Sequence, residues 1–146
     1  MVSTIEVTLD HALFYARHLN MCDPKYVATA VLLELGISTH RDGFEYLVRA
    51  IALYSRNPLQ LYAKQLYIEV GEDAGTDDSA KQVEQAIRSV IIEAWKLRDD
   101  EVWRCYFPAD KNGSIPKPSN GYFISRIGRF LQLWEGCCEG VCYEKG

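Results

Sequence analysis

Apolar residues recur at intervals of three and four along almost the whole chain, which is the spacing of one face of an α-helix. No Asn-Gly turn lies between two runs of alternating apolar and polar residues, so nothing indicates a β-hairpin. The sequence therefore predicts an all-α fold, a compact bundle-like domain of six or more helices. We expect these helices over residues 10–20, 24–35, 41–56, 58–74, 79–98 and 120–134.

The length of 146 residues fits a single domain, and 48% hydrophobic with 25% charged residues is the composition of a chain that folds. We expect residues 1–25 to be an N-terminal extension that contains the extra helix. We expect residues 26–134 to form the main domain. The stretch after residue 134 offers little to bury, so 135–146 is predicted to be a flexible tail.

The sequence offers no sign of membrane insertion, disulfides or a bound cofactor. It has no apolar run long enough to cross a bilayer and no leader-like start, so we expect a cytoplasmic protein. Five cysteines are an odd number, and Cys137, Cys138 and Cys142 lack the paired spacing of a zinc site. We therefore expect reduced thiols, no metal and no cofactor.

Nothing in the chain resembles the machinery of an enzyme. His40 lies in the turn THRDG with no nucleophile or carboxylate pair arranged around it, so it is interpreted as a turn-stabilising histidine. A glycine-rich phosphate loop and a His-Glu metal motif are both missing. The sequence predicts a protein that is not an enzyme.

The stretch YIEVGEDAG, residues 67–75, has the pattern of a first helix followed by a tight turn. Val70 is predicted to point inward. Gly71 is small enough for a second helix to approach, and Gly75 can adopt the positive φ that ends a helix and turns the chain. This pattern is typical of a helix-turn-helix.

The helix after the turn has a clear start and a clear apolar face. Ser79 with Gln82 three residues later forms a capping box, which predicts the first helical turn. Trp95 ends the apolar stripe, and we expect it to be buried against the helix that begins near Pro58. The rest of the stripe consists of Ala80, Val83, Ala86 or Ile87, Val90 and Ala94.

The polar side of this helix carries side chains that can read DNA. Glutamine pairs well with adenine and arginine with guanine in the major groove, and recognition helices use their first turns for such contacts. The alternative is that this is an ordinary solvated face. The candidate DNA-binding residues of the helix are Lys81, Gln82, Glu84, Gln85, Arg88 and Ser89.

Local charge favours DNA binding in one part of the chain and opposes it in another, within a net charge of −4. Residues 69–82 contain five acids and one base, and carboxylates repel phosphates. Asp77 and Asp78 also have a structural use, because they meet the helix dipole. Residues 111–134 contain four bases and no acid, which can steer phosphates or a partner's acidic surface, and from these Lys117 and Arg126 join the DNA-binding candidates.

Three blocks of the sequence resemble the C-terminal effector domain of stage 0 sporulation protein A, the response regulator that starts endospore formation. They are LLELGISTHRDGFEYLVRAI (32–51), VEQAIRSVIIEAW (83–95) and KPSNGYFI (117–124). The resemblance implies a six-helix domain whose helix-turn-helix binds short promoter boxes in duplex DNA, usually as tandem pairs. It also implies RNA polymerase sigma factor as a partner and a homodimer on DNA.

The resemblance also implies which side chains meet the bases. Gln82, Glu84, Gln85 and Arg88 fall where the family places its recognition-helix contacts, and only Glu84 and Arg88 keep the family's residue type. Glutamines replace arginines at the other two positions, and the preceding turn is longer by about two residues and more acidic.

Two functions follow from these features. The first is a transcription-regulator-like domain that binds duplex DNA through the helix at 79–98. The second is a diverged effector domain that acts through contacts with sigma factor, another regulator or a second copy. The family's phosphorylated receiver domain would not fit in the residues before 26, so the resemblance does not extend to regulation by phosphorylation.

Overall fold

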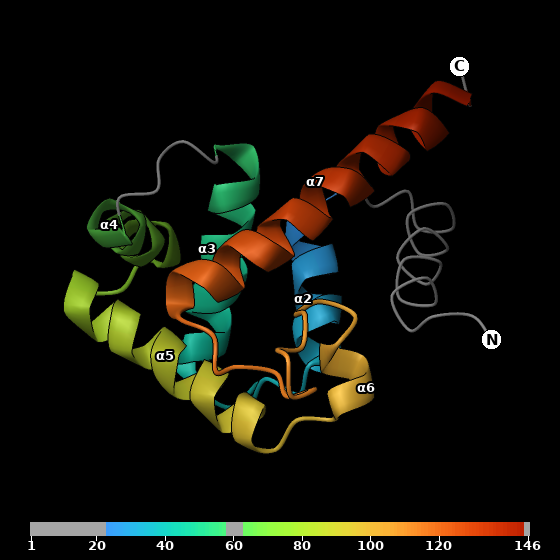
Figure 1. Cartoon of the computed structure of the whole chain (residues 1–146). Helices are drawn as coiled ribbons and strands as arrows, with labels where there is room; N and C mark the ends of the chain where they lie inside the picture. The colour runs from blue at the N-terminus through green and yellow to red at the C-terminus, as the bar shows by residue number, and fades with distance from the viewer. Residues whose placement is uncertain (1–22, 58–62, 145–146) are drawn as a thin grey trace.

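The computed structural model describes residues 23–57 and 63–144 of the chain, with side chains described up to Leu133 (Figure 1). These residues form helices and no strands, so the predicted all-α fold is confirmed. The predicted helix at 10–20 lies outside the described residues. The helices are α2 (Pro24–Glu34), α3 (Asp42–Arg56), α4 (Ala63–Ala74), α5 (Ala80–Lys96), α6 (Asp100–Trp103) and α7 (Asn120–Glu144).

Helix α3 lies at the centre of the domain and packs against α2, α4, α5 and α7 (Figure 1). It is buried on most sides because its apolar residues cover more than one face, among them Leu47, Ala50 and Ile51, which are fully buried. Helix α7 crosses α3 closely at Gly128, where an added Cβ would overlap the ring of Tyr54. The position of α7 therefore depends on a glycine.

Helix α6 is a single turn that the periodicity of the sequence does not predict. It starts at Asp99, whose side chain accepts a hydrogen bond from the backbone N–H of Glu101. The turn places Trp103 in the core, where it is fully buried and packs against the rings of Phe107 and Phe123. Its Nε1 donates a hydrogen bond to the carbonyl of Leu35 at 3.1 Å. One turn is shorter than any window in which an apolar repeat can be recognised.

Trp95 differs from our prediction. It is only half-buried, its Nε1 donates to the carbonyl of Ile115 at 2.9 Å, and the guanidinium of Arg98 lies 4.6 Å from its ring centroid. Its one polar group thus contacts the segment before α7, while its ring packs at the margin of the core and meets Arg98 from its own helix end. The expectation of a buried Trp95 was wrong because the apolar stripe ends at Ala94, which is the last buried residue of α5.

The segment 107–119 is an ordered loop. The carboxylate of Asp110 accepts hydrogen bonds from the backbone N–H groups of Asn112 and Ser114, and Ile115 is fully buried. Its last residues start α7, because Ser119 accepts a hydrogen bond from the N–H of Tyr122 through its side chain. The loop therefore fixes where α7 begins.

Helix α7 continues ten residues past the end that we predicted at 134 and reaches Glu144. The predicted boundary was wrong, because the backbone of most of the predicted tail is helical. No helix of the described ranges has both the length and the hydrophobicity that a bilayer crossing needs.

Candidate nucleic-acid interface

Helices α4 and α5 pack against each other and are joined by residues 75–79 (Figure 1). Gly75 has a φ of 68°, as expected for the residue that ends α4, and the N–H of Thr76 donates to the carbonyl of Gly71 at 3.1 Å. Gly71 is buried with Val83 of α5 beside it, and a Cβ there would meet its nearest neighbours at ordinary contact distance, 3.6 Å or more. Gly75 is thus required by its backbone conformation, whereas alanine would fit at Gly71.

The predicted capping box starts α5. The side chain of Ser79 accepts a hydrogen bond from the N–H of Gln82 at 3.2 Å, and the N–H of Ser79 donates to Oε1 of Gln82 at 2.8 Å. The amide oxygen of Gln82 is therefore occupied by its own helix. The amide nitrogen of this side chain has no partner in its own helix and remains fully available to another molecule.

All six polar residues that we selected on α5 are exposed. Among the described residues, Lys81, Gln85 and Arg88 form no hydrogen bond or ion pair through their side chains. Successive members of this group are four and three residues apart, so they lie on one face of the helix. This face combines two cations and an amide that have no competing protein partner.

The acidic turn before α5 is partly neutralised by α3. The carboxylate of Asp73 lies 2.7 Å from the guanidinium of Arg49 and 3.8 Å from the ammonium of Lys25. The hydrogen bond from Arg49 holds the pKa of Asp73 below its usual value. Two of the five acids of 69–82 thus have partners on α3, because Asp78 accepts a hydrogen bond from the hydroxyl of Tyr46 at 2.6 Å.

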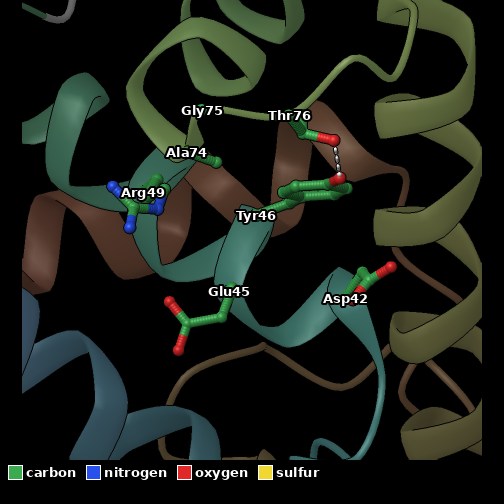
Figure 2. Close-up of a pocket in the computed structure, with 7 residues that line it drawn as sticks. All are labelled: Asp42, Glu45, Tyr46, Arg49, Ala74, Gly75 and Thr76. Carbon is green, nitrogen blue, oxygen red and sulfur yellow. Dashed lines mark hydrogen bonds between the residues drawn. The ribbon is translucent and has the colours of Figure 1, made fainter.

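Tyr46 and Arg49 also line an open pocket between α3 and the turn (Figure 2). Burial is the main cause that raises the pKa of Tyr46, and the hydrogen bond to Asp78 adds to it. Figure 2 shows the Tyr46 hydroxyl directed at Thr76, 3.1 Å away, while the carboxylates of Asp42 and Glu45 point away from that bond. The polar groups of this pocket serve mainly to attach the turn to α3.

The start of α3 holds one edge of α5. A Cβ at Gly43 would overlap the backbone carbonyl of Ala86 and lie 2.9 Å from Cγ1 of Val90, so the two helices approach more closely than any side chain allows. Beside this contact, Arg41 donates to the hydroxyl of Ser89 at 2.9 Å and lies 3.2 Å from the carboxylate of Glu93. The hydroxyl of Ser89 is thus already in contact with α3.

The start of α7 holds the opposite edge of α5. Asn120 is buried, and its Nδ2 donates to the backbone carbonyl of Glu84 at 3.0 Å and to the hydroxyl of Tyr67 in α4 at 3.2 Å. Burial raises the pKa of Tyr67, so its hydroxyl stays protonated. One amide therefore joins α4, α5 and α7.

The two basic candidates outside α5 occupy different surroundings. Lys117 is exposed and lies three residues before Asn120, close to the point where α7 meets α5. Arg126 is exposed too, but its Nε donates to the carbonyl of Tyr106 beyond α6, and no hydrogen bond joins it to α5 in the described part of the chain. Lys117 is therefore the better placed of the two to act together with α5.

Two residues of the interface were missed in the sequence. Arg41 lies in the THRDG turn and Asn120 in the KPSN loop, and both contact α5 from more than thirty residues away. The only local signal was their position inside two of the blocks that carry the resemblance. Neither block shows which of its side chains contacts α5.

The described residues hold no group of three or more histidine, cysteine, aspartate or glutamate side chains that could bind a metal ion. Cys105 is a free thiol, and its Sγ lies 3.4 Å from the carbonyl of Glu101. The side chains of Cys137, Cys138 and Cys142 lie outside the described ones.

A comparison with family models finds a match over residues 28–131. The match runs from α2 into α7 and includes the residues that hold both edges of α5. The family is that of the sporulation initiation factor Spo0A C-terminal domain, a DNA-binding domain of transcription regulation in sporulation. The resemblance drawn from the three sequence blocks is thereby confirmed. The chain belongs to the family of Spo0A C-terminal domains.

Proposed function

We propose that this protein binds duplex DNA by placing the N-terminal half of α5 in the major groove, with α4 and the turn as the rest of a helix-turn-helix. The observation that carries the proposal is the exposed face of Lys81, Gln85 and Arg88, whose side chains have no hydrogen bond or ion pair in the described protein. Groove-reading helices present such residues from their first turns. Membership of the family supports the same function.

The side chains of α5 would take different roles. Arg88 and Gln85 would read base edges, since arginine and glutamine make bidentate contacts there. Lys81, at the start of the helix, would bind a phosphate. Gln82 and Ser89 would contribute less, because a group of each is occupied by Ser79 and Arg41 respectively.

The partly neutralised turn makes this function compatible with the acidic sequence. Asp73 is paired with the guanidinium of Arg49, whereas Asp78 accepts a hydrogen bond from the neutral hydroxyl of Tyr46 and keeps its charge. The exposed carboxylates of Glu72 and Asp77 have no hydrogen bond or ion pair among the described side chains. These two would repel phosphates near the start of α5. We therefore expect binding that is weak at physiological salt and rises steeply as salt is lowered.

Selection of bound sequences from a random duplex library tests the proposal. We expect an enriched motif for the wild type. Loss of a bidentate base contact costs about 1–3 kcal/mol, so Arg88→Ala should relax the motif at one position. Arg104 is an exposed arginine directly after α6, so Arg104→Ala should leave the motif unchanged.

The absence of any enriched motif for the wild type, even at low salt, would favour the second function, contact with proteins such as sigma factor or a second copy of the chain. The observation behind this alternative is the pair Glu72 and Asp77, which presents free negative charge in front of α5. A homodimer on tandem DNA boxes remains part of the first proposal, and the spacing of selected motifs would reveal it.

A further inference from the structure

The end of α3 that meets α5 carries an arginine whose side chain does not serve its own helix. Arg41 is the residue before the first turn of α3, a position whose side chain usually accepts a hydrogen bond from the helix backbone. A guanidinium cannot accept one, because it only donates. It reaches α5 instead, where it contacts Ser89 and Glu93, and 52% of the side chain stays exposed.

The contacts fix the place of this guanidinium relative to the reading face. Ser89 and Glu93 are one helical turn apart, so Arg41 lies along one edge of α5. Arg88 is the neighbour of Ser89 in sequence and belongs to the face proposed to meet the bases. In a duplex that holds a helix in its major groove, the phosphate backbones run along the two edges of that helix.

We propose that Arg41 is a phosphate-binding residue of the DNA interface, supplied by α3 and held beside α5 by Ser89 and Glu93 in the free protein. This inference rests on the proposed function. Arginine suits the role because its planar fork matches phosphate oxygens, and an exposed ion pair such as that with Glu93 is weak enough to be exchanged for a phosphate.

The competing interpretation is that Arg41 only braces α3 against α5. The two roles predict different measurements. A phosphate contact contributes equally to all DNA sequences and to the salt dependence of binding, whereas a brace contributes to the melting temperature. Both can be measured on the same variants of the full chain.

The experiment measures dissociation constants across a series of salt concentrations for a selected duplex and for an unrelated duplex of equal length. Arg41→Ala should weaken both by the same factor and reduce the slope of log affinity against log salt by about 0.9, the value of one phosphate contact. Arg41→Lys keeps the charge and should keep the slope. Arg56→Ala removes an exposed arginine at the opposite end of α3 and should leave both quantities unchanged.

Four results would overturn the inference. If Arg41→Ala lowers the melting temperature but keeps the wild-type slope, Arg41 is a brace. A slope that falls equally for Arg56→Ala would show only an effect of net charge. If the wild type binds neither duplex at the lowest salt, the proposed function itself fails and this inference with it, whereas binding by the wild type with an unchanged Arg41→Ala refutes the inference alone.

Discussion

The two edges of α5 are held by different kinds of contact. The α3 edge is held by close backbone packing, because Gly43 has no side chain and lets the backbone of α3 approach the carbonyl of Ala86. The α7 edge is held by a side-chain hydrogen bond, because the amide of Asn120 donates to the carbonyl of Glu84. Glu84 and Ala86 are two residues apart, so the same turn of the helix is held from both sides.

The two contacts differ in how much displacement they allow. A backbone-to-backbone approach leaves no room for any added atom, since neither helix can move without moving the core behind it. The amide contact is less complete, because Oδ1 of Asn120 is buried without a hydrogen-bond partner among the described residues. We infer that α3 sets the position of α5 and that the contact with α7 contributes less to the stability of that position.

The largest effect is therefore expected at Gly43. Alanine is ordinarily the better helix former, but here its Cβ would overlap the carbonyl of Ala86, so α5 must shift. Overpacking of this kind costs about 1–3 kcal/mol. We expect Gly43→Ala to lower the free energy of unfolding by that amount, as measured by urea denaturation, and to weaken DNA binding in parallel.

Gly121 provides the control, because it lies in the first turn of α7 and an added Cβ would have no atom within 4 Å beyond its chain neighbours and its own helix backbone. Gly121→Ala should be neutral or stabilise the protein by up to about 1 kcal/mol. A Gly43→Ala variant as stable as Gly121→Ala would show that α5 is free to move relative to α3. The distinction between the two edges would then be wrong.

A smaller loss is expected on the α7 side. Asn120→Ala removes the hydrogen bonds to Glu84 and Tyr67, but it also removes a buried oxygen without a partner. Since these terms oppose each other, we expect a loss of about 1 kcal/mol in the free energy of unfolding. Asn112→Ala, in the exposed loop, should change it by less than about 0.5 kcal/mol.

A loss at Asn120 larger than that at Gly43 would reverse the order of the two edges. Asn120→Asp sharpens the measurement, because it keeps the size of the side chain and replaces the donor nitrogen by an oxygen. Such an oxygen would face the carbonyl of Glu84, so the variant should be less stable than Asn120→Ala. Equal stability of the two variants would show that an oxygen facing the carbonyl of Glu84 costs no more than the loss of the side chain.

The sequence predicted those features of α5 that depend on neighbours within one turn. The cap at Ser79 and the exposed polar face follow from spacings of three and four residues, and the structure has both. The two tryptophans show the limit. Trp95 was expected in the core and Trp103 was not selected, because which of them is buried depends on packing against Leu35, Phe107 and Phe123.

Charge in the turn shows the same limit at the interface. Asp73 counted as a repulsive acid in the sequence, because its cationic partner Arg49 precedes it by more than twenty residues. The contacts of Arg41 with α5 span nearly fifty residues. Periodicity and capping describe one helix at a time, so the sequence predicted the reading face but not what surrounds it.

The smallest effect is expected where the α3 edge meets solvent. Glu93 pairs with Arg41, and both side chains are about half exposed, so Glu93→Gln should leave the melting temperature nearly unchanged. The change would free the guanidinium of Arg41 and remove a carboxylate from the edge of the duplex. Because an exposed pair is worth about 1 kcal/mol at most, we expect DNA affinity to rise by no more than about fivefold at low salt.

The gain from Glu93→Gln should disappear at high salt, where exposed charges are screened. Glu101→Gln is the matched control, since it removes an exposed acid from α6 and breaks no ion pair in the described structure. Equal gains for the two variants would mean that only net charge matters. A gain for Glu93→Gln alone means that the edge of α5 held by α3 also faces the DNA, which the sequence of α5 by itself gives no reason to expect.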